Sequence, residues 1–246
     1  MKEWAYARSA LTIVAPSRWI AGLAAASPLL GRFPIHVIPN GVDVEVFRPL
    51  PKEEARHRMG LDPNASVLMF SADSVENPRK GGAFLRAALA QLAEAGAKGI
   101  QLLVVGGDSR CGDWGLPYRV HAMGSVHDDK TMATLYSSAD LFALPTLADN
   151  LPNGILESMA CGTPPVTFDV GGCSDAVRHL DTGYLAKCRD ADDLASGVTL
   201  LLQDAALRRN VSARCRQVIE TEYPAHLEAR RFLELYEHLI GAGSTR

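Results

Sequence analysis

Short apolar runs alternate with amphipathic stretches along most of this 246-residue chain, and this alternation constrains the fold more than any other feature. Apolar runs typical of strands occupy residues 11–14, 36–38, 67–70, 100–105, 119–123, 141–144, 166–170 and 183–185. Helical patterns occupy residues 17–30, 52–59, 82–95, 129–138, 155–160 and most of 191–240. Strands that alternate with helices of about ten to fifteen residues indicate β-α-β units. We therefore expect an α/β fold built on a parallel sheet.

Composition and charge exclude several classes of protein. The formal net charge of −3 gives no basic footprint for nucleic acid or for an anionic membrane. No apolar run reaches the roughly 18 residues that suggest a membrane span. The five cysteines are odd in number and show no close, metal-type pairing. We expect a cytoplasmic protein with reduced thiols and without a nucleic-acid partner.

Glycine-rich or polar loops follow five of the expected strands. In open parallel sheets, ligands bind beyond the carboxyl ends of the strands, so these loops should converge on one edge. They comprise residues 71–80, the segment from Gly106 onward, and residues 124–126, 148–154 and 171–172. This convergence predicts a site for a phosphate-bearing ligand.

One expected helix begins in an unusually polar turn, within the stretch "ADNLPNGILESMACGTPPVTFDVGG" at residues 148–172. Backbone N–H groups at a helix start have no partner within the helix and carry about half a positive charge, which suits a diphosphate. A glycine there lets phosphates approach the backbone closely. The N–H groups expected to be unpaired are those of Asn153, Gly154, Ile155 and Leu156.

Five segments in order carry a family resemblance: "VIPNGVDVEVFRP", "PRKGG", "LLVVGG", "LYSSADLFALPT" and "LPNGILESMACGTPPVTFDVGG". Together they closely resemble the C-terminal half of family 4 (group 1) retaining glycosyltransferases, which have the GT-B fold. The segments "VAPSRWI" and "NLPN" most resemble the corresponding segments of bacterial capsule and exopolysaccharide enzymes. The resemblance implies a Rossmann-like parallel sheet with helices on both faces, which holds a nucleotide-sugar donor.

The resemblance also implies a division of the chain. Residues 1–43 would be a remnant of the N-terminal domain with the interdomain hinge, and residues 44–223 the nucleotide-sugar-binding domain. Residues 224–246 would be the C-terminal crossover helix and tail. The acceptor-binding N-terminal domain would then be a missing partner. Without it, the last helix would expose an apolar stripe, and the chain could self-associate.

Three ionisable residues match family positions with direct roles. Glu157 corresponds to the acid that hydrogen-bonds the ribose hydroxyls, since a carboxylate accepts two bonds from a vicinal diol. Asp149 stands where the family has a glutamate near the donor sugar, and Lys80 matches the lysine that neutralises the diphosphate and assists its departure. We assign Asp149 and Lys80 as catalytic. The alternatives are a solvated helical Glu157, a helix-capping Asp149 and a surface Lys80.

The remaining donor-binding candidates follow from the same resemblance. Gly124, Ser125 and Val126 match the segment that reads the base edge, and Gly171 and Gly172 match the loop near the sugar. The family often has an arginine five or six residues before the lysine, but this chain has Asp73, Ser74 and Val75 there, so Arg79 is the candidate to supply the charge. Asp175 stands where the family has a glutamate, and His121 and His127 are interpreted as structural. No metal and no cofactor are implied.

The resemblance therefore implies a retaining hexosyl transfer from a UDP-, GDP- or ADP-sugar to a glycan or lipid-linked acceptor. The enzyme would be cytoplasmic and could lie peripherally at the inner face of the membrane. The chain would be incomplete, and inactive alone, without the acceptor domain. The alternative is a non-catalytic nucleotide-sugar-binding module. A GT-B epimerase or phosphorylase is a third reading, and the motifs argue against an epimerase.

Overall fold

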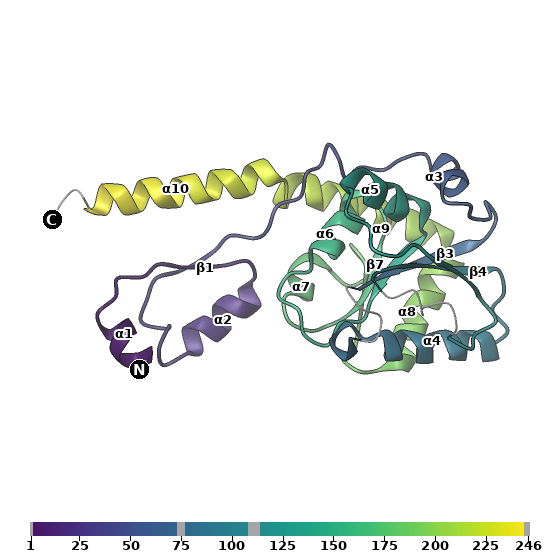
Figure 1. Ribbon diagram of the computed structural model, residues 1–246, viewed down its shortest axis with the longest axis horizontal. Coiled ribbons are helices and arrows are strands. Elements are labelled where there is room, and N and C mark those ends of the chain that lie inside the picture. The colour runs from purple at the N-terminus through teal and green to yellow at the C-terminus, as the bar shows by residue number, and fades with distance from the viewer. Residues whose placement is uncertain (1, 73–76, 108–113, 244–246) are drawn as a thin grey trace.

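The computed structural model describes residues 2–72, 77–107 and 114–243. Figure 1 shows a large domain built around a sheet and a smaller N-terminal lobe beside it. The lobe contains α1 (Lys2–Ala7), β1 (Ile13–Ala15), α2 (Arg18–Ala26) and β2 (Ile35–Val37). β1 and β2 pair in parallel, with Val14 opposite His36. Helix α1 was not expected from the sequence, because Lys2–Ala7 is too short to show a helical period.

The large domain is a six-stranded, wholly parallel sheet in the order β5-β4-β3-β6-β7-β8. Its strands are β3 (Ser66–Ser71), β4 (Ile100–Val105), β5 (Arg119–Ala122), β6 (Leu141–Leu144), β7 (Pro165–Phe168) and β8 (Tyr184–Ala186). The strands β3, β4 and β5 follow one another toward one edge of the sheet, and β6, β7 and β8 follow one another toward the other edge, with β6 next to β3. The sheet confirms the expected Rossmann-like α/β fold, and the reversal at β3 and β6 marks where such sheets bind ligands.

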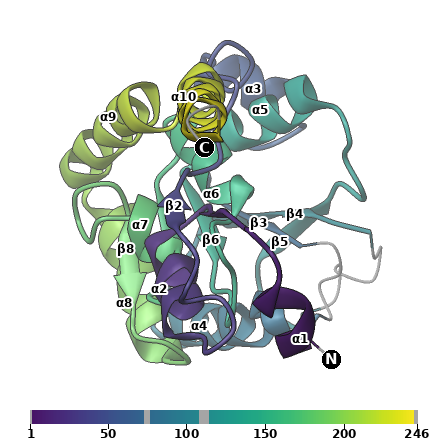
Figure 2. The same ribbon diagram turned by 90° about the vertical axis from the view of Figure 1, so that its left-hand side faces the viewer.

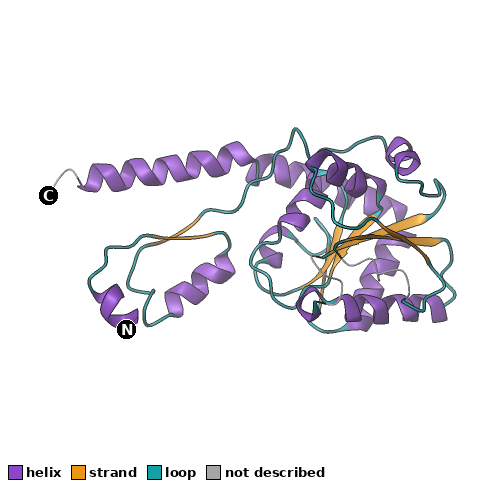
Figure 3. Ribbon diagram, viewed as in Figure 1, coloured by secondary structure: helices purple, strands orange, loops and turns teal. Residues whose placement is uncertain are grey.

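Helices cover both faces of this sheet, as Figures 1 and 3 show. The helix α4 (Gly82–Glu94) packs against α8 (Ala191–Gln203) on one face. On the other face, α3 (Lys52–Arg58), α5 (Asp129–Ser138), α6 (Asn153–Ala160) and α9 (Ala205–Glu222) form a connected layer. The central strands are therefore buried on both sides, which is why they read as continuous apolar runs. β7 ends at Phe168, two residues earlier than expected.

A buried charged cluster fastens α3 to the sheet. The side chain of Arg56 is only 7% exposed, and its guanidinium donates to Asp140 Oδ2 at 2.6 Å and to the carbonyls of Ser138 and Pro63. Asp140 also binds Lys52 Nζ at 2.8 Å and accepts from the N–H of Val67 at 2.8 Å. Each polar atom of this cluster has a partner, which offsets the cost of burying the charges.

The helix α10 (Ala225–Gly243) leaves the large domain and runs toward the side on which the N-terminal lobe lies. In Figure 1 the lobe and α10 both extend to the left of the large domain, and Figure 2 looks along α10 from that side. The helix is joined to the linker after β2: the N–H of Val42 donates to Tyr223 O at 2.8 Å, and the N–H of Gly41 donates to Glu228 Oε2 at 2.8 Å.

The apolar stripe expected on α10 is exposed only in part. Leu235 is 7% exposed, whereas Leu233, Tyr236, Leu239 and Ile240 are 40–71% exposed. The lobe exposes further large apolar side chains, including Trp4, Trp19 and Leu23. Self-association through these side chains remains a prediction.

Candidate functional site

Two adjoining cavities open at the carboxyl ends of β3 and β6, where the chain order reverses. The lysine cavity, of about 390 Å³, is lined by Asn40, Ser71, Ala72, Lys80, Phe142, Leu144, Asp149, Leu151, Pro152, Asn153 and Gly154. The glutamate cavity, of about 300 Å³, is lined by Phe47, Ser71, Ala72, Val105, Gly106, Gly107, Ser125, Val126, His127, Asp129, Met132 and Glu157. Ser71 and Ala72 line both, so one elongated ligand can occupy the two cavities together.

The two residues assigned as catalytic form an ion pair in the lysine cavity. Lys80 Nζ lies 2.8 Å from Asp149 Oδ2, and the two side chains are 16% and 21% exposed. The hydroxyl of Thr146 also faces this carboxylate oxygen, at 3.4 Å. The sequence placed both residues at the site but gave no sign that they pair, because 69 positions separate them.

A short turn aims Lys80 at Asp149. Residues Pro78–Lys80 form a 3₁₀ turn, η1, which Asn77 caps by accepting the N–H of Arg79 at 3.1 Å. The next residue, Gly81, has φ +74°, and a Cβ there would lie 1.8 Å from the carbonyl oxygen of Pro145. Only glycine therefore lets the turn pack against the loop that follows β6. Arg79 itself is exposed and lines neither cavity.

The open helix start expected at α6 is smaller than the sequence suggested. Asn153 and Gly154 line the lysine cavity, and their N–H groups have no acceptor in the described part of the chain. The expectation is wrong at Ile155, whose N–H donates to the carbonyl of Pro152 at 3.0 Å. A tight first turn of this kind is common at helix starts. Ile155 and Leu156 are buried and line neither cavity.

The expected glycine pair supports Asp149 rather than lining a cavity. Gly171 has φ +58°, and a Cβ there would lie 1.9 Å from the carbonyl oxygen of Asp149. The N–H of Gly172 donates to that same oxygen at 3.2 Å. A Cβ on Gly172 would lie 1.7 Å from the carbonyl oxygen of Asn150. The two loops can approach this closely only because both residues lack side chains.

Glu157 projects from α6 into the glutamate cavity. It accepts a hydrogen bond from the hydroxyl of Tyr136 at 3.0 Å through Oε2, while Oε1 has no partner among the residues described. Burial raises the pKa of Glu157, the Tyr136 bond opposes that rise, and the charge of Asp129 adds to it. Burial and the neighbouring carboxylate raise the pKa of Tyr136 well above its ordinary value, so Tyr136 is a permanent donor.

The other wall of the glutamate cavity is more apolar. Val126 and Ser125 line it as expected, but Gly124 does not: its carbonyl accepts the N–H of Gly106 at 2.9 Å and joins the loops after β4 and β5. The apolar Phe47 and Met132 were not predicted as site residues, although Phe47 lies in one of the family-like segments. His127 also lines this cavity.

Two further features of the sequence are the segment before Lys80 and the histidine His121, which itself lines neither cavity. The segment with Asp73, Ser74 and Val75 lies outside the described residues. His121 is half-buried on β5, and its Nε2 has no hydrogen-bond partner among the residues described. Burial, with a smaller effect of Arg119, lowers the pKa of His121 and so favours its neutral form.

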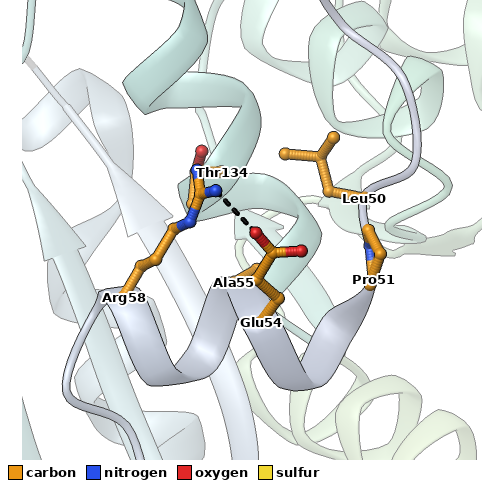
Figure 4. A pocket seen from close by; sticks show the side chains of 6 residues that line it. All are labelled: Leu50, Pro51, Glu54, Ala55, Arg58 and Thr134. Atoms are coloured by element: carbon orange, nitrogen blue, oxygen red, sulfur yellow. Dashed lines mark hydrogen bonds and ion pairs between the residues drawn. The ribbon is translucent and has the colours of Figure 1, made fainter.

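A smaller hollow between α3 and α5 provides a contrast (Figure 4). It measures about 50 Å³. Its two charged side chains, Glu54 and Arg58, bind each other at 2.5 Å, and each is more than half exposed. Over the described ranges, no group of three or more metal-binding side chains occurs, and no helix is long and apolar enough to cross a membrane.

Residues 65–204 match the sequence profile of a family described as glycosyl transferases group 1, and this match covers more than half of the chain. A D-inositol 3-phosphate glycosyltransferase of Rhodococcus opacus is 30% identical over 206 residues, which are 79% of this chain and 44% of the relative. The chain spans about half, or less, of the length of the curated relatives it matches.

Solved structures resemble the fold over nearly the whole chain. Sucrose-phosphate synthase from Thermosynechococcus elongatus superimposes with a TM-score of 0.83 at 25% identity, covering 94% of this chain and 59% of that one. HepE from Anabaena, solved in complex with UDP-glucose, gives a TM-score of 0.79 at 22% identity and covers 94% of this chain and 65% of its own.

Proposed function

Because this chain belongs to the group 1 glycosyltransferases, we propose that it binds a nucleoside-diphosphate sugar as donor for a retaining transfer to a glycan or lipid-linked acceptor. The fold is that of the C-terminal half of a GT-B glycosyltransferase. The observation that carries the proposal is the pair of adjoining cavities with different linings: one has Lys80 and open helix amides, and the other has Glu157 with apolar side chains on its facing wall.

The diphosphate belongs in the lysine cavity. Lys80 offers a positive charge, and the N–H groups of Asn153 and Gly154 offer donors at the positive end of α6. Together they would stabilise the negative charge that develops on the leaving diphosphate when the glycosyl bond breaks. These groups are fixed before the ligand arrives, because η1 and α6 are held by their own hydrogen bonds.

The nucleoside belongs in the glutamate cavity. The free oxygen of Glu157 can accept from a ribose hydroxyl, while Tyr136 holds the other oxygen in place. Phe47, Val126 and Met132 offer apolar contact for a base. A complex of HepE contains UDP-glucose, which supports a nucleotide sugar as ligand here.

The donor sugar would lie toward Asp149, which can orient its hydroxyls and stabilise positive charge at the anomeric carbon. In the described structure this carboxylate instead holds Lys80. Binding of a donor would therefore exchange one partner of Lys80 for another: the phosphates would take the lysine and release Asp149 to the sugar.

The complete reaction needs a second domain that forms the other wall of the donor and acceptor cleft. The chain spans about half of the curated relatives' length, and we propose that an N-terminal acceptor domain supplies the rest of the cleft in a cytoplasmic enzyme. Residues 1–246 would then bind donor without transferring sugar. A module that binds nucleotide sugars and never transfers them is the alternative.

Calorimetry with UDP-glucose, GDP-mannose, ADP-glucose and their nucleoside diphosphates tests the proposal. We expect saturable binding of one nucleotide family, abolished or strongly weakened in Lys80→Met. Lys98→Met is the matched control, because Lys98 is exposed and lines neither cavity. Absence of binding to all six ligands would refute the proposal. Binding followed by transfer once the acceptor domain is added would exclude the non-catalytic module.

A further inference from the structure

We propose that Ser17, in the N-terminal lobe, is a positioning residue that holds Asp149 in place at the sugar end of the donor site. This inference rests on the proposed function, because it assigns Asp149 to the donor sugar. Ser17 lies 132 positions before Asp149 and lines neither cavity, so nothing in its sequence context points to this role.

Ser17 is a buried link between the lobe and the loop that carries Asp149. It is the N-cap of α2, where its Oγ accepts the N–H of Ile20 at 3.2 Å. Its hydroxyl donates to Asn150 Oδ1 at 2.5 Å. The residue is 0% exposed, so water cannot replace this bond without a rearrangement. A hydroxyl used in both directions fixes the side chain of Asn150 relative to α2.

A second bond fixes the same end of α2. The N–H of Arg18 donates to Asp175 Oδ2 at 2.5 Å. Asp175 lies in α7 (Cys173–Ala176), just after the glycine pair that supports Asp149. Two successive residues of the lobe therefore contact the two loops that meet behind the site.

The backbone at residues 149–150 packs closely against the glycine pair. Gly171 and Gly172 approach the carbonyl oxygens of Asp149 and Asn150 so closely that neither glycine could carry a Cβ. Ser17 lies at the same junction, because its Cβ is 2.7 Å from the position that a Cβ on Gly172 would take. The loop thus has little room to shift while the Ser17 bond is present.

The carboxylate of Asp149 projects from this backbone to Lys80 at 2.8 Å. Glu157 is held separately, by Tyr136 on α5, and has no hydrogen bond to Ser17 among the described residues. Loss of the Ser17 hydroxyl should therefore loosen Asp149 and leave the nucleoside end unchanged. The effect should appear in how strongly the protein prefers a nucleotide sugar over the bare nucleoside diphosphate.

The test compares the dissociation constants of UDP-glucose and UDP, or of the corresponding pair if the panel above selects another base. In Ser17→Ala we expect the preference for the sugar-bearing ligand to fall about three- to tenfold, the range of one ordinary hydrogen bond. Ser27→Ala is the matched control. Ser27 ends the same helix and accepts the N–H groups of Leu29 and Leu30, but has no bond to the loop. In Ser27→Ala the preference for the sugar-bearing ligand should not change.

A double-mutant cycle separates positioning from a general loss of stability. Asp149→Ala should lower the same preference, and adding Ser17→Ala to it should cause no further fall. An unchanged preference in Ser17→Ala would overturn the inference, as would an additive effect in the double variant. If Ser17→Ala fails to fold, Asn150→Ala removes the same bond from the other side and carries the test. An unmodified chain that binds no nucleotide sugar would refute the proposed function itself, whereas an unchanged preference refutes only the role of Ser17.

Discussion

Replacing Asp149 with asparagine should tighten the binding of a nucleoside diphosphate. In the described structure Lys80 is occupied by the Asp149 carboxylate at 2.8 Å, so a phosphate must displace that carboxylate and then remain near its negative charge. Asparagine has nearly the same shape but no charge. The variant therefore removes a competitor for the lysine without emptying the space.

The size of the effect follows from the burial of the pair. Exposed ion pairs contribute about 0.2–1 kcal/mol, and removal of one partner from a fully buried pair costs about 3–5 kcal/mol. With side chains 16% and 21% exposed, this pair lies between those limits but is still reached by solvent. We expect a gain of about 1–2 kcal/mol, which is roughly a five- to thirtyfold tighter dissociation constant.

Isothermal calorimetry with UDP, or with the diphosphate of the preferred base, measures this gain at low and at high salt. The gain should shrink as salt rises. The gain should also shrink when Lys80 is replaced by methionine in both backgrounds, because no lysine is then left to compete for and only the repulsion between the carboxylate and the phosphate remains. Equal or weaker binding of UDP by Asp149→Asn would show that the carboxylate does not compete with phosphate, and the exchange of partners on Lys80 would be wrong.

Three further predictions address the nucleoside end, the buried charges and the whole reaction. Glu157→Ala should weaken nucleoside-diphosphate binding by roughly 1.5–3 kcal/mol in calorimetry, and the exposed Glu53→Ala should not. In the unmodified chain, affinity should fall as pH drops through the pKa of Glu157, which burial raises above the ordinary value of about 4.3, and Glu157→Gln should abolish this dependence. Burial alone would raise the pKa of Asp140, but Lys52, the Val67 N–H and Arg56 together lower it, so its stabilisation is complete above pH ~4 and is lost as pH falls through the lowered value. Asp140→Asn should cost about 3–5 kcal/mol in urea unfolding at pH 7 and less in acid; an equal cost at both pH values would contradict this. Residues 1–246 should bind donor without acceptor-dependent release of nucleoside diphosphate, because no acceptor is held in position and that orientation is worth up to ~7–11 kcal/mol of the barrier. Sustained, acceptor-dependent release would show that residues 1–246 are sufficient for transfer.

The sheet was predictable from the sequence because its central strands are buried on both faces. Val67, Leu68, Met69 and Phe70 are all at most 2% exposed, and such a run has few alternatives to a central strand. Observed strand boundaries lie within about two residues of the expected ones. Elements without periodicity were not predictable: α1 is short, and α7 has only four residues.

The candidate site was predictable as a set of residues but not as an arrangement. A lysine, two acids and a polar helix start are visible in the sequence, whereas the Lys80–Asp149 bond depends on β6 lying beside β3. The bond from Ile155 to Pro152 depends on how tightly one turn closes, which composition does not reveal. The Ser17–Asn150 bond joins parts of the chain 133 residues apart, and no local pattern encodes it.

The junction between the linker and α10 has a mechanical consequence. Because Gly41 and Val42 are bonded to Glu228 and Tyr223, the outgoing linker and the first turn of the helix form one unit. The 19 residues of α10 extend about 28 Å at 1.5 Å per residue, so the helix acts as a lever arm on that unit. A rotation of about 5° at the junction would swing the far end of the helix by roughly 2–3 Å over that length. A small rotation of the linker that leads to the lobe would therefore produce its largest displacement near the far end of the helix, at Leu239 and Ile240.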